Sequence, residues 1–491
     1  MTTWPSSPSA ARAGALRPAA MLCLTLLLGA CASRGPDHPP LPSTPPAAAG
    51  LTAPDTTPVA ADWWRALGDP QLDRLVELAL KDQPSLATAR ARVARAQALA
   101  DGTRANGQAQ GALDFNITRQ RFTENGLYPP PFAGTIWNSG FLQIGANWSP
   151  DFFGQHAAEL AAALGRERAA QAEAAGVANA LAAQVARAYI ALARLLAQRE
   201  VLARVLGQRD EILALTRARQ GAGLDTRVEL TQAEGALPDA RLQIEALDEQ
   251  IALARHLAAV LAGQAPGTLD ALSPRLQALH LEPTPVMLGT DLLGRRPDLV
   301  AARWRVEATT QDVAEAGARF YPNINLSAFI GLSTLGLAPM LERGSRQGGF
   351  SPALHLPLFD GGRLRAQLGG RQAELDEAIA QYNGLLLDAV REASDAISST
   401  QSLVRQQDEV ARSLASAETA YSLAMQRYKA GLSSYLTVLN AENQLLVQRR
   451  QAVDIQGRQL DTRVALMKAL GGGWHEDTRT ANAPTSALAT P

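Results

Sequence analysis

The sequence contains two copies of one long pattern. Residues 219–224 read Arg-Gln-Gly-Ala-Gly-Leu and residues 427–432 read Arg-Tyr-Lys-Ala-Gly-Leu, so four residue types recur at an offset of 208 positions (427 − 219 = 208). An Ala-Glu pair follows each copy at the same offset, at 233–234 and 441–442. Long stretches that are poor in glycine and proline flank both copies. A repeat of this length indicates one structural unit used twice, here a long helical hairpin with the shared motif at its tip.

Residues 1–30 have the pattern of a secretory signal peptide. Arg12 and Arg17 precede an apolar run that is too short for a transmembrane helix, and this run ends in Leu-Gly-Ala before Cys31. That ending resembles a bacterial lipobox. The resemblance implies cleavage before Cys31, diacylation of its thiol and, because Ala32 is not the aspartate that retains lipoproteins at the inner membrane, an outer-membrane location. The alternative is an ordinary signal peptide with an incidental cysteine.

Composition argues against several classes of function. The formal net charge is −1, so no broad basic surface is available for nucleic acid. The six histidines are scattered, and we find no nucleophile elbow, phosphate loop or dinucleotide fingerprint. We therefore expect no enzymatic activity, no metal and no cofactor other than the covalent lipid on Cys31. We also expect no transmembrane helix after Cys31, so any membrane crossing must use strands of a closed barrel.

Two regions change from helical to alternating periodicity. Leu113, Phe115 and Ile117 alternate with polar residues, and residues 324–328 do so again. These patterns predict one strand pair at about 111–149 and another at about 322–358. Strands of roughly ten residues suit a tilted membrane crossing. Four strands in one chain are too few to enclose a lumen, whereas three chains with four strands each would close an even-numbered barrel.

Each strand pair is followed by a predicted helical hairpin, at 155–263 and at 362–471. Residues 155–220 lack proline, and as one helix they would extend roughly 100 Å. Apolar residues in both copies keep the spacing of a helix-packing seam, more regularly in the first copy. The seams are Leu181, Val185, Ala188, Leu192, Leu195, Leu202 and Leu206, and Val390, Ala393, Ile397, Val404, Ala411 and Leu414. A solitary antiparallel coiled coil is the simpler alternative.

These patterns predict a mainly α fold with a small β part and an internal duplication. The predicted order is a proline-rich linker at 31–61, a first repeat at 62–263, a connector at 264–288, a second repeat at 289–472 and a disordered tail at 473–491. Gly471-Gly-Gly473 is interpreted as the end of a helix followed by a frayed terminus.

Four ordered motifs resemble those of the TolC-like outer membrane efflux factors, and most closely the lipid-anchored subgroup serving multidrug and metal export pumps of the resistance-nodulation-division type. The motifs are Trp-Trp-Arg-Ala-Leu-Gly-Asp-Pro-Gln-Leu at 63–72, Asp-Leu-Leu-Gly-Arg-Arg-Pro-Asp-Leu at 291–299, Phe-Tyr-Pro-Asn-Ile-Asn-Leu at 320–326 and Pro-Leu-Phe-Asp-Gly-Gly-Arg at 357–363. The resemblance implies a homotrimer in the outer membrane. Its strands would form a single β-barrel, continuous with a periplasmic α-barrel that docks to a periplasmic adaptor and an inner-membrane pump.

Functional residues are expected at the hairpin tips. The resemblance implies that Arg219, Gly223, Arg427 and Gly431 engage the adaptor, although glycine and arginine at a helix end are also explained by capping. The gate candidates of the closed end are Asp225, Tyr428, Leu432, Ser433 and Tyr435. The two tyrosines could form hydrogen bonds between hairpins or only pack, and Asp225 could simply favour the start of the next helix. Ser433-Ser434 stands where many relatives have aspartates, which puts an acidic ring in doubt.

The predicted function is a passive exit duct for small molecules in a tripartite efflux pump, with a gate at the periplasmic tip. One alternative is an outer-membrane duct for type I secretion of polypeptides. Another is a lipid-anchored periplasmic spacer without a pore. Ion conductance distinguishes the spacer from both ducts.

Overall fold

The computed structural model describes residues 38–50, 59–280 and 292–476, which form two compact units. The first unit contains residues 38–42, 95–167 and 304–380. The second contains the rest of the described chain, at 43–50, 59–94, 168–280, 292–303 and 381–476. The predicted signal peptide, Cys31 and parts of the predicted linker, connector and tail lie outside the described residues.

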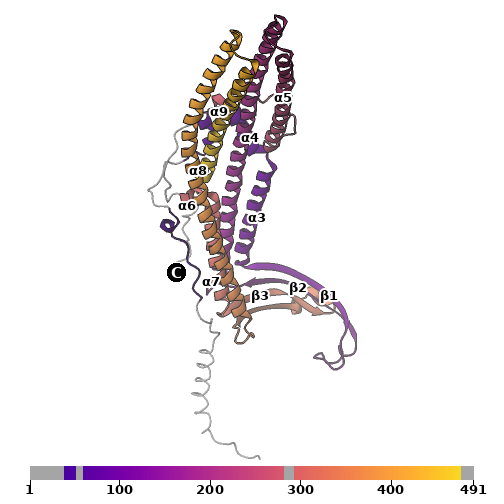
Figure 1. Cartoon of the computed structure of the whole chain (residues 1–491). Helices are drawn as coiled ribbons and strands as arrows, with labels where there is room; N and C mark the ends of the chain where they lie inside the picture. The colour runs from indigo at the N-terminus through magenta and orange to yellow at the C-terminus, as the bar shows by residue number, and fades with distance from the viewer. Residues whose placement is uncertain (1–37, 51–58, 281–291, 477–491) are drawn as a thin grey trace, which may run out of the picture. The chain divides into compact units, whose positions relative to one another are not determined.

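The first unit holds one antiparallel sheet of four strands in the order β1-β2-β3-β4 (Figure 1). The strands are β1 (Gln110–Arg121), β2 (Ile136–Trp148), β3 (Asn323–Leu335) and β4 (Arg346–His355). Both predicted strand pairs are present, and the strands extend beyond the alternating residues that indicated them. The pairing of β2 with β3 joins the two repeats in a single sheet.

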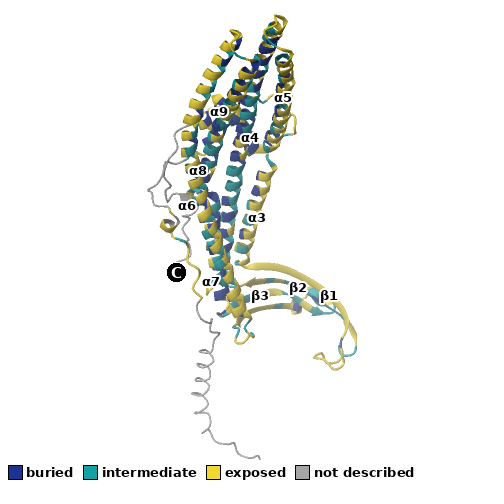
Figure 2. Cartoon of the chain, in the orientation of Figure 1, coloured by how far each residue is buried: buried dark blue, intermediate teal, exposed yellow. Residues whose placement is uncertain are grey.

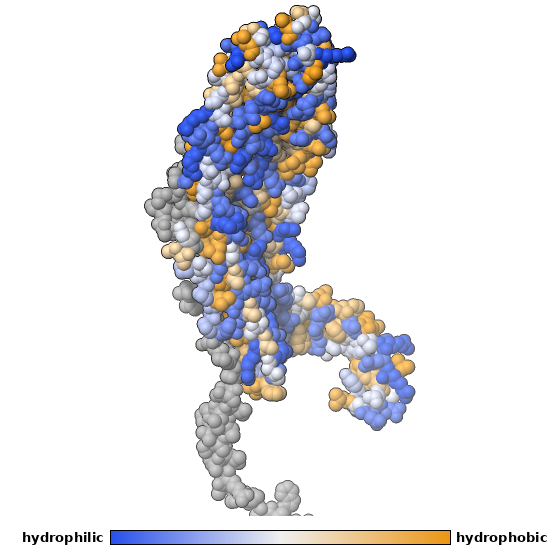
Figure 3. Space-filling model, viewed as in Figure 1, coloured by the Kyte–Doolittle hydropathy of each residue, from blue (hydrophilic) through white to orange (hydrophobic). Residues whose placement is uncertain are grey.

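The strand register separates apolar from polar residues. Leu113 pairs with Ile144, which pairs with Ile330, and residues opposite each other in a ladder share one face of the sheet. By alternation along the strands, the same face carries further exposed apolar residues, Phe115, Ile117, Phe350 and Leu354. The other face is mostly polar, with Asp114, Asn116, Gln143, Asn147, Asn325 and Ser327. Figure 3 shows hydrophobic residues in orange over the strands.

The sheet has two open edges within the part of the chain that the structure describes. β1 pairs only with β2, and β4 pairs only with β3. An edge strand leaves a row of backbone N–H and C=O groups without ladder partners. Lipid cannot form hydrogen bonds with these groups.

The helices follow the duplication closely. α4 (Gln155–Gly221) and α8 (Arg363–Lys429) each have 67 residues, and α5 (Arg227–Leu261) and α9 (Tyr435–Ala469) each have 35. Each bound in the second copy lies 208 positions after its counterpart (363 − 155 = 208; 435 − 227 = 208). The remaining helices are α2 (Pro70–Asp82), α3 (Pro84–Asn106), α6 (Leu292–Arg295) and α7 (Pro297–Ala318), with 3₁₀ turns η1 (Pro46–Ala49), η2 (Trp63–Leu67), η3 (Leu276–Ala278), η4 (Ala338–Leu341) and η5 (Arg343–Ser345).

The main core of the second unit covers one face of α4. Trp63 and Leu72, from η2 and α2, belong to the same buried cluster as Val185 and Tyr189. Tyr189 also donates a 2.6 Å hydrogen bond from its hydroxyl to Asp69, the residue that caps α2. Buried residues in dark blue run along the helices, whereas much of α5 is exposed (Figure 2). The motif that begins at Trp63 therefore anchors a small helical layer on α4.

The expectation of no helix long and apolar enough to cross a membrane is wrong for one segment. α4 contains an 18-residue window that meets both criteria, and 61% of that window is buried inside the structure. Its apolar side chains, such as Val185 and Leu192, are fully buried in protein contacts. This segment is consistent with a core helix, because alanine and leucine serve close helix packing as well as contact with lipid.

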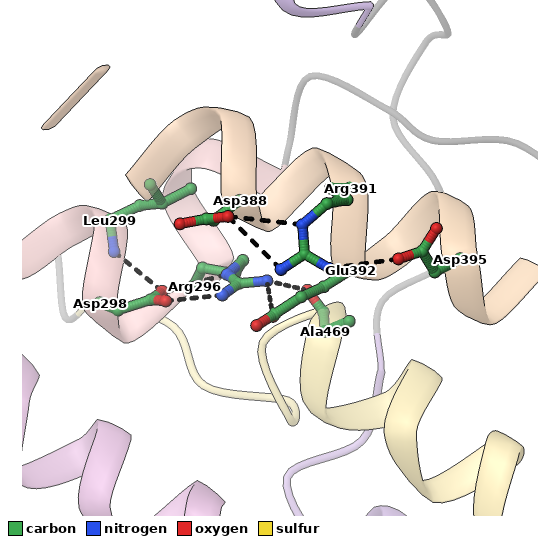
Figure 4. A network of polar contacts seen from close by, with 8 residues as sticks. All are labelled: Arg296, Asp298, Leu299, Asp388, Arg391, Glu392, Asp395 and Ala469. Carbon is green, nitrogen blue, oxygen red and sulfur yellow. Dashed lines mark hydrogen bonds and ion pairs between the residues drawn. The ribbon is translucent and has the colours of Figure 1, made fainter. Parts of the chain in front are cut away.

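The motif around Pro297 is architectural (Figure 4). The buried guanidinium of Arg296 binds Asp298 through two nitrogens, at 2.6 and 3.1 Å, and binds Glu392 of α8 at 3.0 Å. It also donates to the backbone carbonyl of Ala469, at the end of α9. Burial alone would raise the pKa of Asp298, but the hydrogen bonds from Arg296 outweigh it and lower the pKa. One arginine thus joins α7, α8 and α9.

The glycines after α9 correct the interpretation of a frayed end. A Cβ at Gly471 would lie 2.1 Å from the carbonyl oxygen of Arg295, and one at Gly473 would lie 2.2 Å from that of Ala60. Both glycines are buried, and Glu476 pairs with Arg303 at 2.6 Å. The chain is therefore packed through residue 476, because only glycine permits such close backbone approach. Residues 477–491 of the predicted tail lie outside the described residues.

Candidate functional site at the hairpin tips

Both hairpins end in the same turn. Gly223 and Gly431 have φ angles of 75° and 77°, in the left-handed region that favours glycine. After α4, the N–H of Leu224 donates to the carbonyl of Arg219 at 2.9 Å. After α8, the N–H of Leu432 donates to the carbonyl of Arg427 at 2.8 Å. These bonds close a Schellman motif in each copy, which explains why glycine recurs at this position.

The helices that follow the turns begin differently. Thr226 caps α5 by accepting a hydrogen bond from Val228 N–H, and Glu229 accepts one from the N–H of Thr226, which completes a capping box. The corresponding Ser434 makes no side-chain cap on α9, and the hydroxyl of Ser433 is buried without a partner among the described residues. The second tip is thus the less firmly fixed of the two.

Arg219, Asp225 and Tyr428 form one network across the two hairpins. Arg219 donates to both carboxylate oxygens of Asp225, at 2.9 and 3.2 Å, and to the backbone carbonyl of Tyr428 at 3.0 Å. The Tyr428 hydroxyl donates to Asp225 at 2.6 Å and lies 2.9 Å from the hydroxyl of Thr216. The Arg219 guanidinium also lies 4.6 Å from the centre of the Tyr428 ring, within range of a cation–π contact.

This network is almost sealed from solvent. The side chains of Arg219 and Asp225 are 11% and 6% exposed, and Tyr428 is fully buried. Burial raises the pKa of Asp225, but hydrogen bonds from Arg219 and Tyr428 outweigh it and lower the pKa. Burial, followed by the hydrogen bond to Asp225, raises the pKa of Tyr428 to about 12. At neutral pH, Asp225 is therefore ionised and Tyr428 keeps its proton.

The predicted tip residues divide into two groups. Arg219, Asp225 and Tyr428 come together, and Tyr435 packs 6.2 Å from Tyr428 between ring centres, in an apolar cluster shared by both hairpins. Arg427 is exposed, and its guanidinium has no partner within the described part of the chain. Burial raises the pKa of Tyr435, and its hydroxyl has no hydrogen bond among the described residues. Of the two tyrosines, one bonds between hairpins and the other packs.

The asymmetry follows from substitutions between the two copies. At the offset of 208, Asp225 corresponds to Ser433, and Tyr428 corresponds to Gln220. Each copy therefore supplies one partner of the bond between hairpins. Asp225 binds Arg219 and Tyr428 in addition to preceding α5.

A second polar cluster, formed by side chains of α4, α5 and α9, was not predicted from the sequence. Arg209 of α4 donates to Glu442 of α9 at 2.9 Å, and these residues are 5% and 2% exposed. Arg209 also donates to Asp239 and to the carbonyl of Ala236, both in α5. One oxygen of Glu442 is buried without a partner in the described structure. The signal was present, because Glu442 belongs to the repeated Ala-Glu pair, whereas its counterpart Glu234 forms an exposed pair with Arg217.

Each tip also presents two apolar side chains to solvent. Leu224 and Val228 are 66% and 62% exposed, and Leu432 and Leu436 are 69% and 50% exposed. The members of each pair are four residues apart, and the pairs are related by the offset of 208. Within the described ranges, no group of histidine, cysteine, aspartate or glutamate side chains could hold a metal ion. The tips combine a buried polar network with an exposed apolar rim.

Comparison with known proteins identifies the family. The model of the family described as "Outer membrane efflux protein" matches residues 75–263 and 288–472. The fusaric acid resistance protein FusA of Burkholderia cepacia is 38% identical over 366 residues, covering 72% of this chain and 69% of that protein. The multidrug resistance outer membrane protein MdtP of Escherichia coli K12 is 31% identical over 422 residues, covering 84% and 86%. The crystal structure of the outer membrane protein VceC of Vibrio cholerae superposes with a TM-score of 0.80 at 35% identity, covering 84% of this chain and 99% of that one. The chain therefore belongs to the outer membrane efflux protein family and acts in the outer membrane as an efflux channel, not as an enzyme.

Proposed function

We propose that three copies of this chain assemble into the exit duct of a tripartite efflux pump. The observation that carries this proposal is the sheet, which has an exposed apolar face and two open edges, at β1 and β4. A single copy would leave both edges unpaired in lipid, whereas edge-to-edge joining of three copies would pair every edge in a twelve-stranded barrel. The apolar face would then contact lipid and the polar face would line water.

The helices support the same assembly. In the first copy, the seam residues Val185 and Leu192 are fully buried within the chain. In the second copy, Ala393 is fully buried but Val404 is 55% exposed, and Ala411 is also exposed. Part of a helix-packing seam is therefore uncovered in one copy. A neighbouring copy in a trimeric α-barrel would cover it, which a solitary coiled coil would not.

The tip network would act as the gate of this duct. Asp225 and Tyr428 join the first hairpin to the second, so the described tip is the state in which the hairpins are held together. A periplasmic adaptor can shift this equilibrium only by binding the dilated tip more tightly than the closed one. The exposed Arg427 and the apolar pairs at Leu224 and Leu432 offer contacts for such an adaptor, and Gly223 and Gly431 set the turns that present them. Tyr435 packs in the apolar cluster shared by both hairpins, and the hydroxyl of Ser433 is buried.

Three readouts test the assembly. Purified protein should have the mass of a trimer in detergent and should conduct ions in a planar bilayer. A stable monomer would refute the trimer, and an absence of conductance would favour a non-conducting spacer. In cells, cysteines placed at Ala222 or Ala430 should form crosslinks to an adaptor bound to an inner-membrane pump. Crosslinks to a secretion system that exports polypeptides would contradict the proposed cargo class.

The lipid on Cys31 is part of the same proposal. The described chain starts seven residues later, where His38 binds Asp376 of α8 at 2.8 Å and the N–H of Leu41 donates to the same carboxylate at 2.9 Å. The N-terminal segment is thus attached to α8 in the unit that contains the strands. A diacyl chain on Cys31 would add a membrane anchor near the membrane-spanning sheet.

A further inference from the structure

A groove in the second unit has one apolar and one basic side. It lies between α4, α5 and α9 and encloses a cavity of about 540 Å³. From α5, only Leu257 and Leu261 line it, and Leu257 is 54% exposed. From α4 and α9 it receives three arginines, Arg187, Arg194 and Arg458. No charged residue of α5 lines the groove, so its two sides differ in chemistry.

Two of the arginines are held by a ladder of ion pairs. Arg187 pairs with Asp461 at 2.9 Å and Arg194 pairs with Asp454 at 2.8 Å, so residues seven apart on α4 meet residues seven apart on α9. Gly457 lies between the two pairs. A Cβ at that position would lie 2.8 Å from the Cδ of Arg194, so glycine leaves the room that the arginine side chain occupies.

The third arginine of the groove, Arg458, forms no ion pair among the described residues. It is exposed, and its hydrogen bond to the side-chain oxygen of Gln406 is long, at 3.4 Å. No carboxylate within the described chain pairs with it. Because Asp461 and Asp454 are already matched by two arginines, the groove keeps a positive charge beside an exposed leucine.

The groove receives residues from the side of α4 that lies opposite Val185 and Tyr189. Val185 and Tyr189 face the core that η2 and α2 cover. Arg187, Ala191 and Arg194 follow each other at helical spacings of four and three, on the other side of the helix.

We propose that this groove binds amphipathic organic anions, molecules with one carboxylate on an aromatic or aliphatic body, as they pass through the duct. The carboxylate would bind Arg458, and the body would pack on Leu257 and Leu261. The volume suits a small organic molecule. One uncommitted arginine gives weak, reversible binding, which conduction requires. The inference rests on the proposed function, because only a groove in a tunnel wall meets the cargo.

The test uses the assembled channel in detergent, with 4-butylbenzoate and its neutral analogue 4-butylbenzamide as probes in calorimetric titrations. The benzoate should bind more tightly than the amide. Arg458→Gln should raise the Kd for the benzoate about tenfold, as expected for a lost charge-assisted hydrogen bond, without changing that of the amide. Arg450→Gln is the matched control, because Arg450 is exposed on α9 but does not line the groove.

Two further variants test the apolar side of the groove. Leu257→Ser should weaken binding of both probes, whereas Leu253→Ser should not, because Leu253 is similarly exposed on α5, one turn away, and lies outside the groove lining. Equal affinity for benzoate and amide, or equal benzoate affinity in wild type and Arg458→Gln, would overturn the proposal.

A neighbouring copy could instead fill the groove. In that case Leu257→Cys would resist thiol reagents in the trimer, and the wild-type protein would bind no benzoate, which also overturns the proposal. The conductance of the same samples shows whether a failure concerns the groove or the proposed duct. A conducting trimer that binds no benzoate refutes only the groove, whereas a non-conducting protein refutes the duct.

Discussion

The hydroxyl of Tyr428, near the end of α8, donates a 2.6 Å hydrogen bond to the carboxylate of Asp225, in the turn between α4 and α5. The two residues are 203 positions apart and come from different copies of the repeat. Arg219 fixes the same carboxylate from its own hairpin. Arg219 also donates to the backbone carbonyl of Tyr428, and the Tyr428 hydroxyl lies 2.9 Å from that of Thr216, so the tip is held by hydrogen bonds both between the hairpins and within the first one.

Tyr428→Phe should destabilise the closed tip while keeping its packing. The variant removes the hydroxyl that binds Asp225, and a hydrogen bond to a charged group contributes about 1.5–3 kcal/mol. If that energy is present only in the closed state, the open fraction rises by roughly tenfold or more. Single-channel recording in planar bilayers measures it.

The matched control is Tyr421→Phe. Tyr421 is partly buried on the same helix, and its hydroxyl makes no hydrogen bond within the described chain. It should leave the open fraction unchanged. Equal conductance of Tyr428→Phe and wild type would show that the bond does not hold the tip.

We expect a low pH to favour the open tip, because Asp225 becomes protonated. The pKa of this carboxyl is lowered in the described state, so its stabilising contribution is present above the ordinary aspartate pKa of about 3.9. The contribution is lost as the pH falls below that range through the lowered pKa. Tyr428, with a pKa of about 12, does not titrate there. Conductance should therefore rise steeply only below about pH 4.

Asp225→Asn supplies the comparison for the acid effect. The amide cannot form the ion pair with Arg219, so this variant should conduct at neutral pH about as wild type does in acid. Its conductance should also lose most of its dependence on pH below the aspartate range. An unchanged acid response in Asp225→Asn would assign the titration to another group.

The repeat in the sequence predicted the two long helical hairpins, at 155–263 and 362–471, within two residues of the observed helices at 155–261 and 363–469. Every bound of α8 and α9 lies 208 positions after its counterpart in α4 and α5, because a duplicated sequence carries its helix starts and its glycine turns with it. The strand pairs also followed from period-two alternation. The adaptor roles of Arg219, Gly223, Arg427 and Gly431 and the lipid on Cys31 stay predictions.

Contacts between the two copies could not be predicted in this way. An offset shows which residues are equivalent, but not which residue of one copy touches which residue of the other. The ladder between β2 and β3, the Tyr428–Asp225 bond and the Arg209–Glu442 pair are all contacts of this kind. They depend on how the copies pack, and tertiary packing leaves no local period in the sequence.

Gly431→Pro should weaken efflux while leaving the trimer and its surface location intact. At Gly431 the φ angle is 77° and the N–H donates to the carbonyl of Tyr428 at 3.0 Å. Proline cannot adopt a positive φ and has no N–H, so the turn must rearrange. Drug susceptibility of cells that carry the variant measures the loss. Normal resistance would count against the tip as the functional site.

Cys31→Ser should remove lipid without removing the channel from the outer membrane. Metabolic labelling with a radioactive fatty acid should mark the wild-type protein and not the variant. Because the strands would still cross the bilayer, the variant should keep its conductance once it is exported. Labelling of Cys31→Ser would contradict lipidation at this position.

Removing one member of the Arg209–Glu442 pair should destabilise the hairpins more than removing both. The two side chains are 5% and 2% exposed, so Glu442→Leu leaves a guanidinium buried with only Asp239, Asn443 and a carbonyl, and Arg209→Leu leaves a carboxylate buried alone. Breaking such a pair costs about 3–5 kcal/mol, whereas replacing both partners by apolar residues is often neutral.

Thermal unfolding of the two single variants and the double variant gives the coupling free energy directly. The exposed counterpart pair, Arg217 and Glu234, is the control, and its coupling should fall below about 1 kcal/mol because solvent screens it. If the loss of stability in the double variant at 209 and 442 equalled the sum of the losses in the two single variants, the two residues would not be coupled. Recovery in the double variant would show that Arg209 stabilises α4, α5 and α9 mainly by neutralising Glu442, which the exposed Glu234 of the first copy does not require.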